Sequence, residues 1–173
     1  MIRPVRRIVT GVNAAGRSLI VSDGATQNFS LPDHSPIVAQ VVWATGEGAA
    51  PGDDPAPAGH EFGFHSDDGT VLRIVDFPPD ETYSLDKVRT FLDENHVRDQ
   101  ENPRHFWFHK TPSLDYAIVL EGEIYAMMDE GETLMREGDV LIQRATNHSW
   151  SNRSGKVCRM AFVLIARGED ESV

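Results

Sequence analysis

The second half of the chain is a succession of short segments in which apolar and polar residues alternate. Gly, Asp, Glu or Asn residues separate these segments, which read HFWFH, DYAIVLEG, EIYAMM, GDVLIQR, HSWSN and KVCRMAFVLI from residue 105 onward. Alternation with period two is typical of strands that bury one face, and several short strands at this spacing indicate a sandwich or a barrel. We therefore predict an all-β fold for this chain.

The first half adds further strand candidates and one helix. RRIVTG, RSLIVSDG, SPIVAQVVWATG and GTVLRIVDFPPD mix β-branched residues with turn residues, as strands and their ends do. The segment ETYSLDKVRTFLDENH predicts a helix, with Ser84 as the N-cap and Asp86 in the first turn facing the helix dipole. Val88, Phe91 and Leu92 form its apolar face, which we expect to pack against the strands.

A long loop is predicted between Gly46 and Gly69, where Gly, Ala, Pro and Asp are abundant. Loops of this length are functional or irregular surface segments. The sequence leaves two interpretations open, a surface excursion and a lid over a binding site. His60 and His65 lie in this loop, and we expect both side chains to be exposed to solvent.

Composition narrows the class of protein. A chain of 173 residues suits one domain, and its net charge of -11 disfavours nucleic acid and anionic membrane surfaces as partners. The start MIRPVRRIVTG lacks the apolar run of a signal peptide, and no apolar stretch is long enough to span a bilayer, so we expect a cytoplasmic location. Cys158, the single cysteine, lies in the apolar run VCRMAFVLI and is expected to be a buried, inert thiol.

The candidate chemical site consists of His109, Asp115 and His148. Each histidine lies at the edge of a strand pattern, and Asp115 opens the apolar run YAIVL, where an unpaired carboxylate would be costly. Period two places Asp115 on the same face as Ala117 and Val119, and places His148 on the same face as Trp150 and Asn152.

If both faces line a barrel, two imidazoles and one carboxylate converge. Such a set suits Fe(II), and also Mn(II), Zn(II) or Ni(II). The competing interpretation is a group of hydrogen-bonded polar residues near strand ends, with no metal.

These residues carry a resemblance to the cupin superfamily, in the small single-domain conserved-barrel group. The first cupin motif has His-x-His, then Glu, then a Gly that closes the strand, and His109, Thr111, Asp115 and Gly122 stand at those places. The second motif runs from Gly-Asp to a His followed by an Asn, which Gly138-Asp139, His148 and Asn152 match. The resemblance covers residues from about Gly69 to Ile165.

The chain departs from the family pattern at three points. Thr111 replaces the second histidine of the first motif, and a hydroxyl is a poorer metal ligand than an imidazole. Asp115 is one carbon shorter than the usual Glu, and the turn QRATN lacks the family's Pro and Gly. The sequence therefore leaves two alternatives open: a metal site of two histidines and one aspartate, or a barrel without metal.

The resemblance implies a single domain, residues 1–173, with a double-stranded β-helix or jelly-roll barrel. Additional N-terminal strands and the long loop would occupy residues 1–68, the barrel core residues 69–166 and an acidic tail residues 167–173. One short helix would accompany the barrel. Cupins of this kind are commonly homodimers with exchanged N-terminal strands, so a homodimer is expected, with neither nucleic acid nor membrane as a partner.

The resemblance also implies a function and its residues. A divalent metal (Fe, Mn, Zn or Ni) would bind His109, Asp115 and His148, in a dioxygenase, decarboxylase or isomerase acting on a small organic acid or oxygenated aromatic compound. The alternative is a metal-free cupin that binds a small molecule without catalysis. No catalytic residue is assigned. The expected lining of the pocket comprises Thr111, Gln143, Trp150, Asn152 and Met160.

Overall fold

The computed structural model describes residues 3–30, 37–46, 54–65, 68–97 and 104–167. Within them the chain forms ten strands, one α-helix and a short 3-10 turn, in agreement with the predicted all-β fold. The helical elements are η2 (Asp80–Thr82) and α1 (Leu85–Glu94). The strands are β1 (Arg6–Val12), β2 (Ser18–Ala25), β3 (Val38–Ala44), β4 (Thr70–Phe77), β5 (Leu114–Glu121), β6 (Glu123–Met128), β7 (Glu132–Arg136), β8 (Val140–Arg144), β9 (His148–Ser151) and β10 (Cys158–Ile165).

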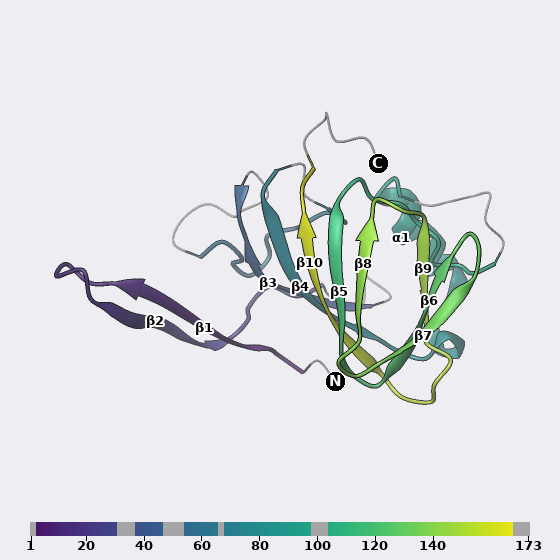
Figure 1. Cartoon of the computed structure of the whole chain (residues 1–173), viewed down its shortest axis with the longest axis horizontal. Helices are drawn as coiled ribbons and strands as arrows, with labels where there is room; N and C mark the ends of the chain where they lie inside the picture. The colour runs from purple at the N-terminus through teal and green to yellow at the C-terminus, as the bar shows by residue number, and fades with distance from the viewer. Residues whose placement is uncertain (1–2, 31–36, 47–53, 66–67, 98–103, 168–173) are drawn as a thin grey trace.

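Two antiparallel sheets build the barrel (Figure 1). The larger sheet has the order β3-β4-β10-β5-β8 and the smaller one the order β7-β6-β9. One apolar core joins them, since it contains Val75 and Phe162 from the large sheet together with Ile124 and Trp150 from the small one. The predicted register of β5 is confirmed, because Asp115, Ala117 and Val119 are all buried.

Two strand predictions need correction. HFWFH is not a strand, and only His109 at its end makes a β-bridge. Trp107 instead packs on Val88 and Leu92 of α1, in a second apolar cluster that Phe106 also joins, so the pattern of apolar residues there reflects helix packing. The strand β7 was not predicted because its polar sequence ETLMR is mostly exposed and pairs only with β6.

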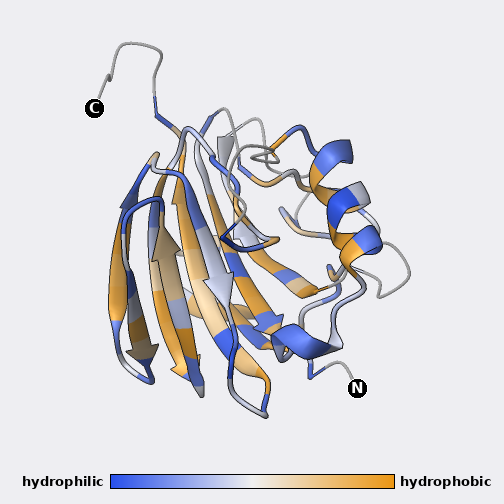
Figure 2. Ribbon diagram, turned by 90° about the vertical axis from the view of Figure 1, so that its right-hand side faces the viewer, coloured by the Kyte–Doolittle hydropathy of each residue, from blue (hydrophilic) through white to orange (hydrophobic). Residues whose placement is uncertain are grey.

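The helix α1 agrees with the prediction. Ser84 is its N-cap residue, although its side chain makes no capping hydrogen bond, and Asp86 lies in the first turn. Val88 and Leu92 are fully buried. Figure 2 shows α1 to one side of the strands, where its apolar face and Trp107 close one flank of the barrel.

The N-terminal strands form a separate hairpin. β1 and β2 pair only with each other, and Figure 1 shows this ribbon projecting away from the barrel. Ile8, Val12 and Ile20 are each at least half exposed on it. No helix in the described part of the chain has the length and apolar content needed to cross a membrane.

The long loop begins and ends at one point of the large sheet. Gly46 and Gly69 both have positive φ, and a Cβ on Gly69 would lie 2.2 Å from the carbonyl oxygen of Thr45, so only glycine fits there. β3 belongs to the same sheet as β4, so the barrel extends to the N-terminal side of the boundary predicted at residue 69. Of the predicted acidic tail, residues 168–173 lie outside the described residues.

Candidate functional site

The two candidate histidines are neighbours across a short antiparallel bridge. The backbone N–H of His109 donates to the carbonyl of His148 at 2.9 Å, and the N–H of His148 donates back at 3.0 Å. Their ring centroids are 4.2 Å apart. Strand pairing therefore brings together two side chains that are far apart in the sequence.

Backbone carbonyls fix the tautomer of both rings. Nδ1 of His109 donates to the carbonyl of Trp107 at 2.6 Å, and Nδ1 of His148 donates to the carbonyl of Thr146 at 3.0 Å. Nε2 of each neutral ring therefore carries the lone pair, and it makes no hydrogen bond within the described residues. Burial lowers the pKa of His109 to about 4 and that of His148 well below its usual value, so both rings are neutral at pH 7.

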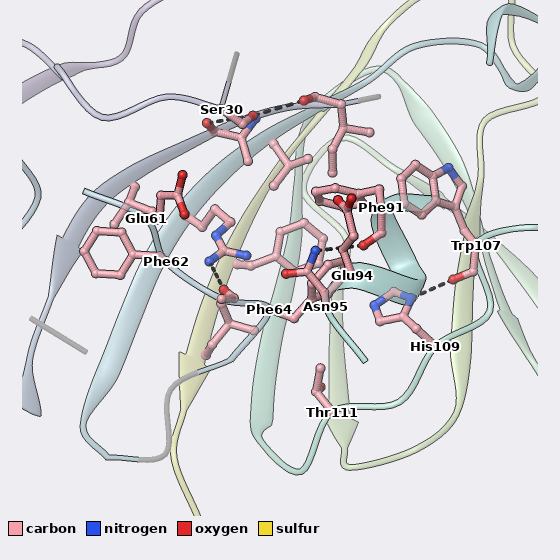
Figure 3. A pocket seen from close by; sticks show the side chains of 18 of the residues that line it. Ser30, Glu61, Phe62, Phe64, Phe91, Glu94, Asn95, Trp107, His109 and Thr111 are labelled. Carbon is pink, nitrogen blue, oxygen red and sulfur yellow. Dashed lines mark hydrogen bonds between the residues drawn. The ribbon is translucent and has the colours of Figure 1, made fainter. Parts of the chain in front are cut away.

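A cavity of about 750 Å³ opens beside this pair. His109, His148 and Trp150 form part of its wall, and the described part of the long loop contributes residues 59–64 on another side. Figure 3 shows His109 and Trp107 on one side of the cavity and Phe62 on the other. Its volume and mixed lining suit a small, partly apolar ligand.

Asp115 also lines the cavity, and Gln143 of β8 orients its carboxylate. Its Oδ2 accepts a hydrogen bond from Nε2 of Gln143 at 2.9 Å, whereas its Oδ1 is buried without a hydrogen-bond partner in the described part of the chain. Burial raises the pKa of Asp115, and the Ser113 hydroxyl and the Arg73 guanidinium partly offset that effect. Among the described residues, no group of three or more His, Cys, Asp or Glu side chains is arranged to hold a metal ion. The predicted trio is therefore not a preformed set of ligands.

The predicted lining of the cavity matches the structure at two residues and needs correction at three. Thr111 and Trp150 line it, but Gln143, Asn152 and Met160 do not. Gln143 holds Asp115, and Met160 is fully buried in the apolar core.

The side chain of Asn152 makes hydrogen bonds to backbone groups. Its amide nitrogen donates to the carbonyls of Phe77 and Lys156, and its Oδ1 accepts from Ser154. The asparagine that ends the second motif thus fixes the turn between β9 and β10.

Two features of the cavity were missed by sequence reasoning. Arg73 of β4 lines it and donates from Nη2 to the carbonyl of Gly63 at 2.6 Å, so the long loop is tied to the barrel. His60 and His65 are half-buried in that loop, which corrects the expectation that they are exposed. The signal for Arg73 was available, because the alternation of Val71, Arg73 and Val75 places a cation on the core face of its strand.

The opposite face of β9 carries a second polar group, which we call the outer cluster: Asp80, His105, Ser149 and Ser151. Nδ1 of His105 lies 2.6 Å from the Ser149 hydroxyl, and its Nε2 lies 3.2 Å from Oδ2 of Asp80. The Ser151 hydroxyl donates to that same oxygen at 2.6 Å. Both nitrogens of this imidazole are therefore used within the protein. Cys158 is buried as predicted, and burial raises the pKa of its thiol to about 12.

Comparison with known proteins identifies the fold family. No family model matches the chain. A cupin-domain-containing oxidoreductase of Aspergillus ruber is 30% identical over 169 residues, which cover 93% of this chain and 72% of that protein. The chain belongs to the cupin superfamily.

Two further proteins are similar to this chain. A cupin-domain-containing oxidoreductase of Hypocrea virens is 27% identical over 172 residues, covering 95% of this cupin and 77% of the relative. The solved cupin domain of Schizosaccharomyces pombe Cnp3 is 11% identical, with a TM-score of 0.48, and the match covers 94% of this chain and 88% of that one. Both of these curated relatives, which match more than nine-tenths of this chain, are named as cupin-domain-containing oxidoreductases.

The cupin family implies a bound metal, and the two histidines fit one. Metal-ligating histidines commonly donate their other ring N–H to a backbone carbonyl, as His109 and His148 do. Asp115 is not grouped with them as a third ligand, because no set of three His, Cys, Asp or Glu side chains in the described residues is arranged to hold a metal ion. The residues present therefore form a two-imidazole donor pair on the cavity wall.

Proposed function

We propose that this cupin is a metal-dependent oxidoreductase that acts on a small organic acid or oxygenated aromatic compound in the barrel cavity. The observation that carries the proposal is the His109–His148 pair, whose Nε2 atoms have no partner within the described residues and whose rings line the cavity. The names of the two curated relatives, both cupin-domain-containing oxidoreductases, also support it.

Each part of the site has a physical role in this proposal. His109 and His148 would hold a divalent ion (Fe, Mn, Zn or Ni), which supplies an open coordination position for substrate or oxygen when bound. Trp150 and Phe64 exclude water from the apolar part of the substrate, and Phe64 also packs edge-on against His109 with ring centroids 5.1 Å apart. Asp115, with its raised pKa and unpartnered Oδ1, is suited to accept or donate a proton.

Metal analysis tests this proposal directly. The freshly purified protein should contain close to one equivalent of a divalent metal by mass spectrometry, or should take it up on supplementation. His148→Gln should lose that metal while it keeps its fold by circular dichroism. His96→Asn is the matched control, because His96 is exposed, lies outside the cavity and has a positive φ that asparagine tolerates. A wild-type protein that stays metal-free after supplementation would exclude the proposal.

A second candidate is a metal-free cupin that binds a small molecule without catalysis. It is favoured by the lack, among the described residues, of three His, Cys, Asp or Glu side chains arranged to hold a metal ion, and by Thr111, which stands where the family has a further imidazole. Ligand-induced thermal shifts that are unchanged by a chelator would support this candidate. Shifts that disappear with the chelator would support the metal-dependent enzyme instead.

We further propose that the chain forms a homodimer through its N-terminal hairpin. Ile8 and Val12 lie on one face of β1, and Ile20 of β2 lies on the same face because it pairs with Thr10 between them. This exposed apolar face projects from the barrel without cover from the described residues (Figure 1). Light scattering should give twice the chain mass, and Ile20→Asp should give a monomer. A wild-type monomer would contradict the proposal.

A further inference from the structure

Arg73 occupies a core position of the large sheet. It lies between β3 and β10, paired with Val41 on one side and Phe162 on the other, and both of these neighbours line the cavity. Val71 and Val75, two residues away on the same face, are buried in the apolar core. A guanidinium at such a position needs partners for its N–H groups.

The partners present satisfy Arg73 only in part. Nη2 donates to the carbonyl of Gly63, but Nε is buried and makes no hydrogen bond within the described residues. Asp115 attracts the guanidinium through its charge, but the hydrogen bond that the Arg73 side chain makes within the described residues goes to Gly63. Burial lowers the pKa of Arg73 to about 10, so the group is still a cation at pH 7. A half-buried cation with a buried, unused donor is suited to bind an anion from the cavity.

We propose that Arg73 binds a carboxylate group of the ligand, so that the cavity takes an organic acid with an apolar or aromatic body. This inference rests on the proposed function, because it takes the cavity to be the substrate site. It narrows the substrate class to acids and names the residue that recognises them.

The walls of the cavity suit the rest of such a molecule. The Arg73 guanidinium is tied to Gly63, and Phe62 and Phe64 on either side of that glycine line the cavity. Figure 3 shows Phe62 and His109 on opposite sides of it. An acid held at Arg73 can therefore lie along the aromatic side chains and present its body to the two histidines.

Other charged side chains around the cavity do not replace Arg73. Lys87 is exposed on α1, so water screens its charge. Asp115 is buried and adds negative charge near Arg73, so ligands with one acidic group are favoured over ligands with two. Three acidic side chains of the cavity lining are also exposed, so water screens their repulsion of an anionic ligand: Glu61, Asp86 and Glu94.

The test compares 3-phenylpropionate with its neutral amide, 3-phenylpropionamide, by calorimetry on the full chain treated with a chelator. Wild type should bind the acid about tenfold more tightly than the amide or better. Arg73→Met should abolish this preference, and Arg73→Lys should keep part of it. Arg136→Met, which removes an exposed arginine far from the cavity lining, should leave it unchanged.

A second measurement separates binding from a purely structural role. Arg73→Met should unfold within a few degrees of wild type, because the loss of one hydrogen bond to Gly63 is offset by the removal of a charge that is only partly satisfied. A large loss of stability would instead assign Arg73 to holding the long loop. Equal affinity of wild type for acid and amide, no measurable binding of the acid, or a preference that survives in Arg73→Met would each overturn the inference.

The proposed metal-dependent function and the proposed role of Arg73 can be refuted independently of each other. If the acid binds only to metal-loaded wild type and His148→Gln abolishes that binding, the carboxylate is bound by the metal and the role of Arg73 is refuted while the proposed function stands. If no metal binds but the preference for the acid disappears in Arg73→Met, the proposed function fails and the role of Arg73 stands.

Discussion

The two faces of β9 carry polar groups of similar composition that are satisfied to very different extents. In the outer cluster, both nitrogens of His105 and both carboxylate oxygens of Asp80 have partners within the protein. On the cavity face, Nε2 of His148 and Oδ1 of Asp115 have none within the described residues. Buried polar atoms without partners are costly, so they mark the face on which a ligand completes the hydrogen bonds or the coordination.

The two aspartates differ in the same way. Burial raises the pKa of Asp80, but hydrogen bonds from His105, Ser151 and the Asn152 backbone outweigh it and leave the pKa below its usual value. The pKa of Asp115 is raised, because burial is only partly offset. The direction is decided by the balance between the desolvation of each carboxylate and the hydrogen bonds and charges that stabilise its ionised form.

The largest expected effect contrasts the two kinds of histidine by metal affinity. His109→Gln and His148→Gln should each weaken the binding of a divalent metal by about two orders of magnitude or more, since each removes one of two imidazole donors. His105→Gln should leave the affinity unchanged. Isothermal titration with Mn(II) or Zn(II) measures these affinities. An equal loss of metal affinity in all three variants would contradict the assignment of metal binding to the cavity face of β9.

The second effect contrasts the same histidines by stability. His105→Ala should lower the free energy of unfolding by about 3 kcal/mol, because it removes the imidazole packed there, one of the hydrogen bonds to Asp80 and the partner of the Ser149 hydroxyl. His148→Gln should cost less, about 1 kcal/mol, because its ring has one hydrogen bond to lose. Urea denaturation of metal-free protein gives both values, and the reverse order would contradict the comparison.

The third effect uses pH to separate the aspartates. Because the pKa of Asp115 is raised in the folded state, its contribution to stability is present below the unfolded pKa near 3.8 and is lost as pH rises through the folded pKa. Asp115→Asn should therefore gain stability relative to wild type as pH increases above about 4, by about 1 kcal/mol at the plateau.

Asp80→Asn should behave in the opposite way. The pKa of Asp80 is lowered in the folded state, so its stabilising contribution is present above the unfolded pKa and is lost as pH falls through the folded pKa. The variant should therefore be less stable than wild type at pH 7, and the difference should shrink in acid. Unfolding curves between pH 3 and pH 8 measure both variants, and parallel pH profiles would contradict the assignment.

Much of the fold was predictable from sequence because strand and helix periodicities are local. The alternation in DYAIVLEG predicted the buried face of β5, and the Val88 and Leu92 spacing predicted the buried face of α1. HFWFH was misread because Phe106 and Trp107 are apolar for packing against a helix, and a five-residue window does not distinguish that from a strand. The strand β7 was missed because little of it is buried.

The sequence by itself determined the class of the fold, the residues that can carry chemistry and the cupin motifs around His109 and His148. Only the tertiary structure decided how these residues are used. Pairing of distant strands brings the two histidines together, directs Gln143 to Asp115 and aims Asn152 at backbone carbonyls. Which polar atoms are left unpartnered depends on contacts between segments far apart in the chain, and that is why the role of Arg73 emerged only from the folded molecule.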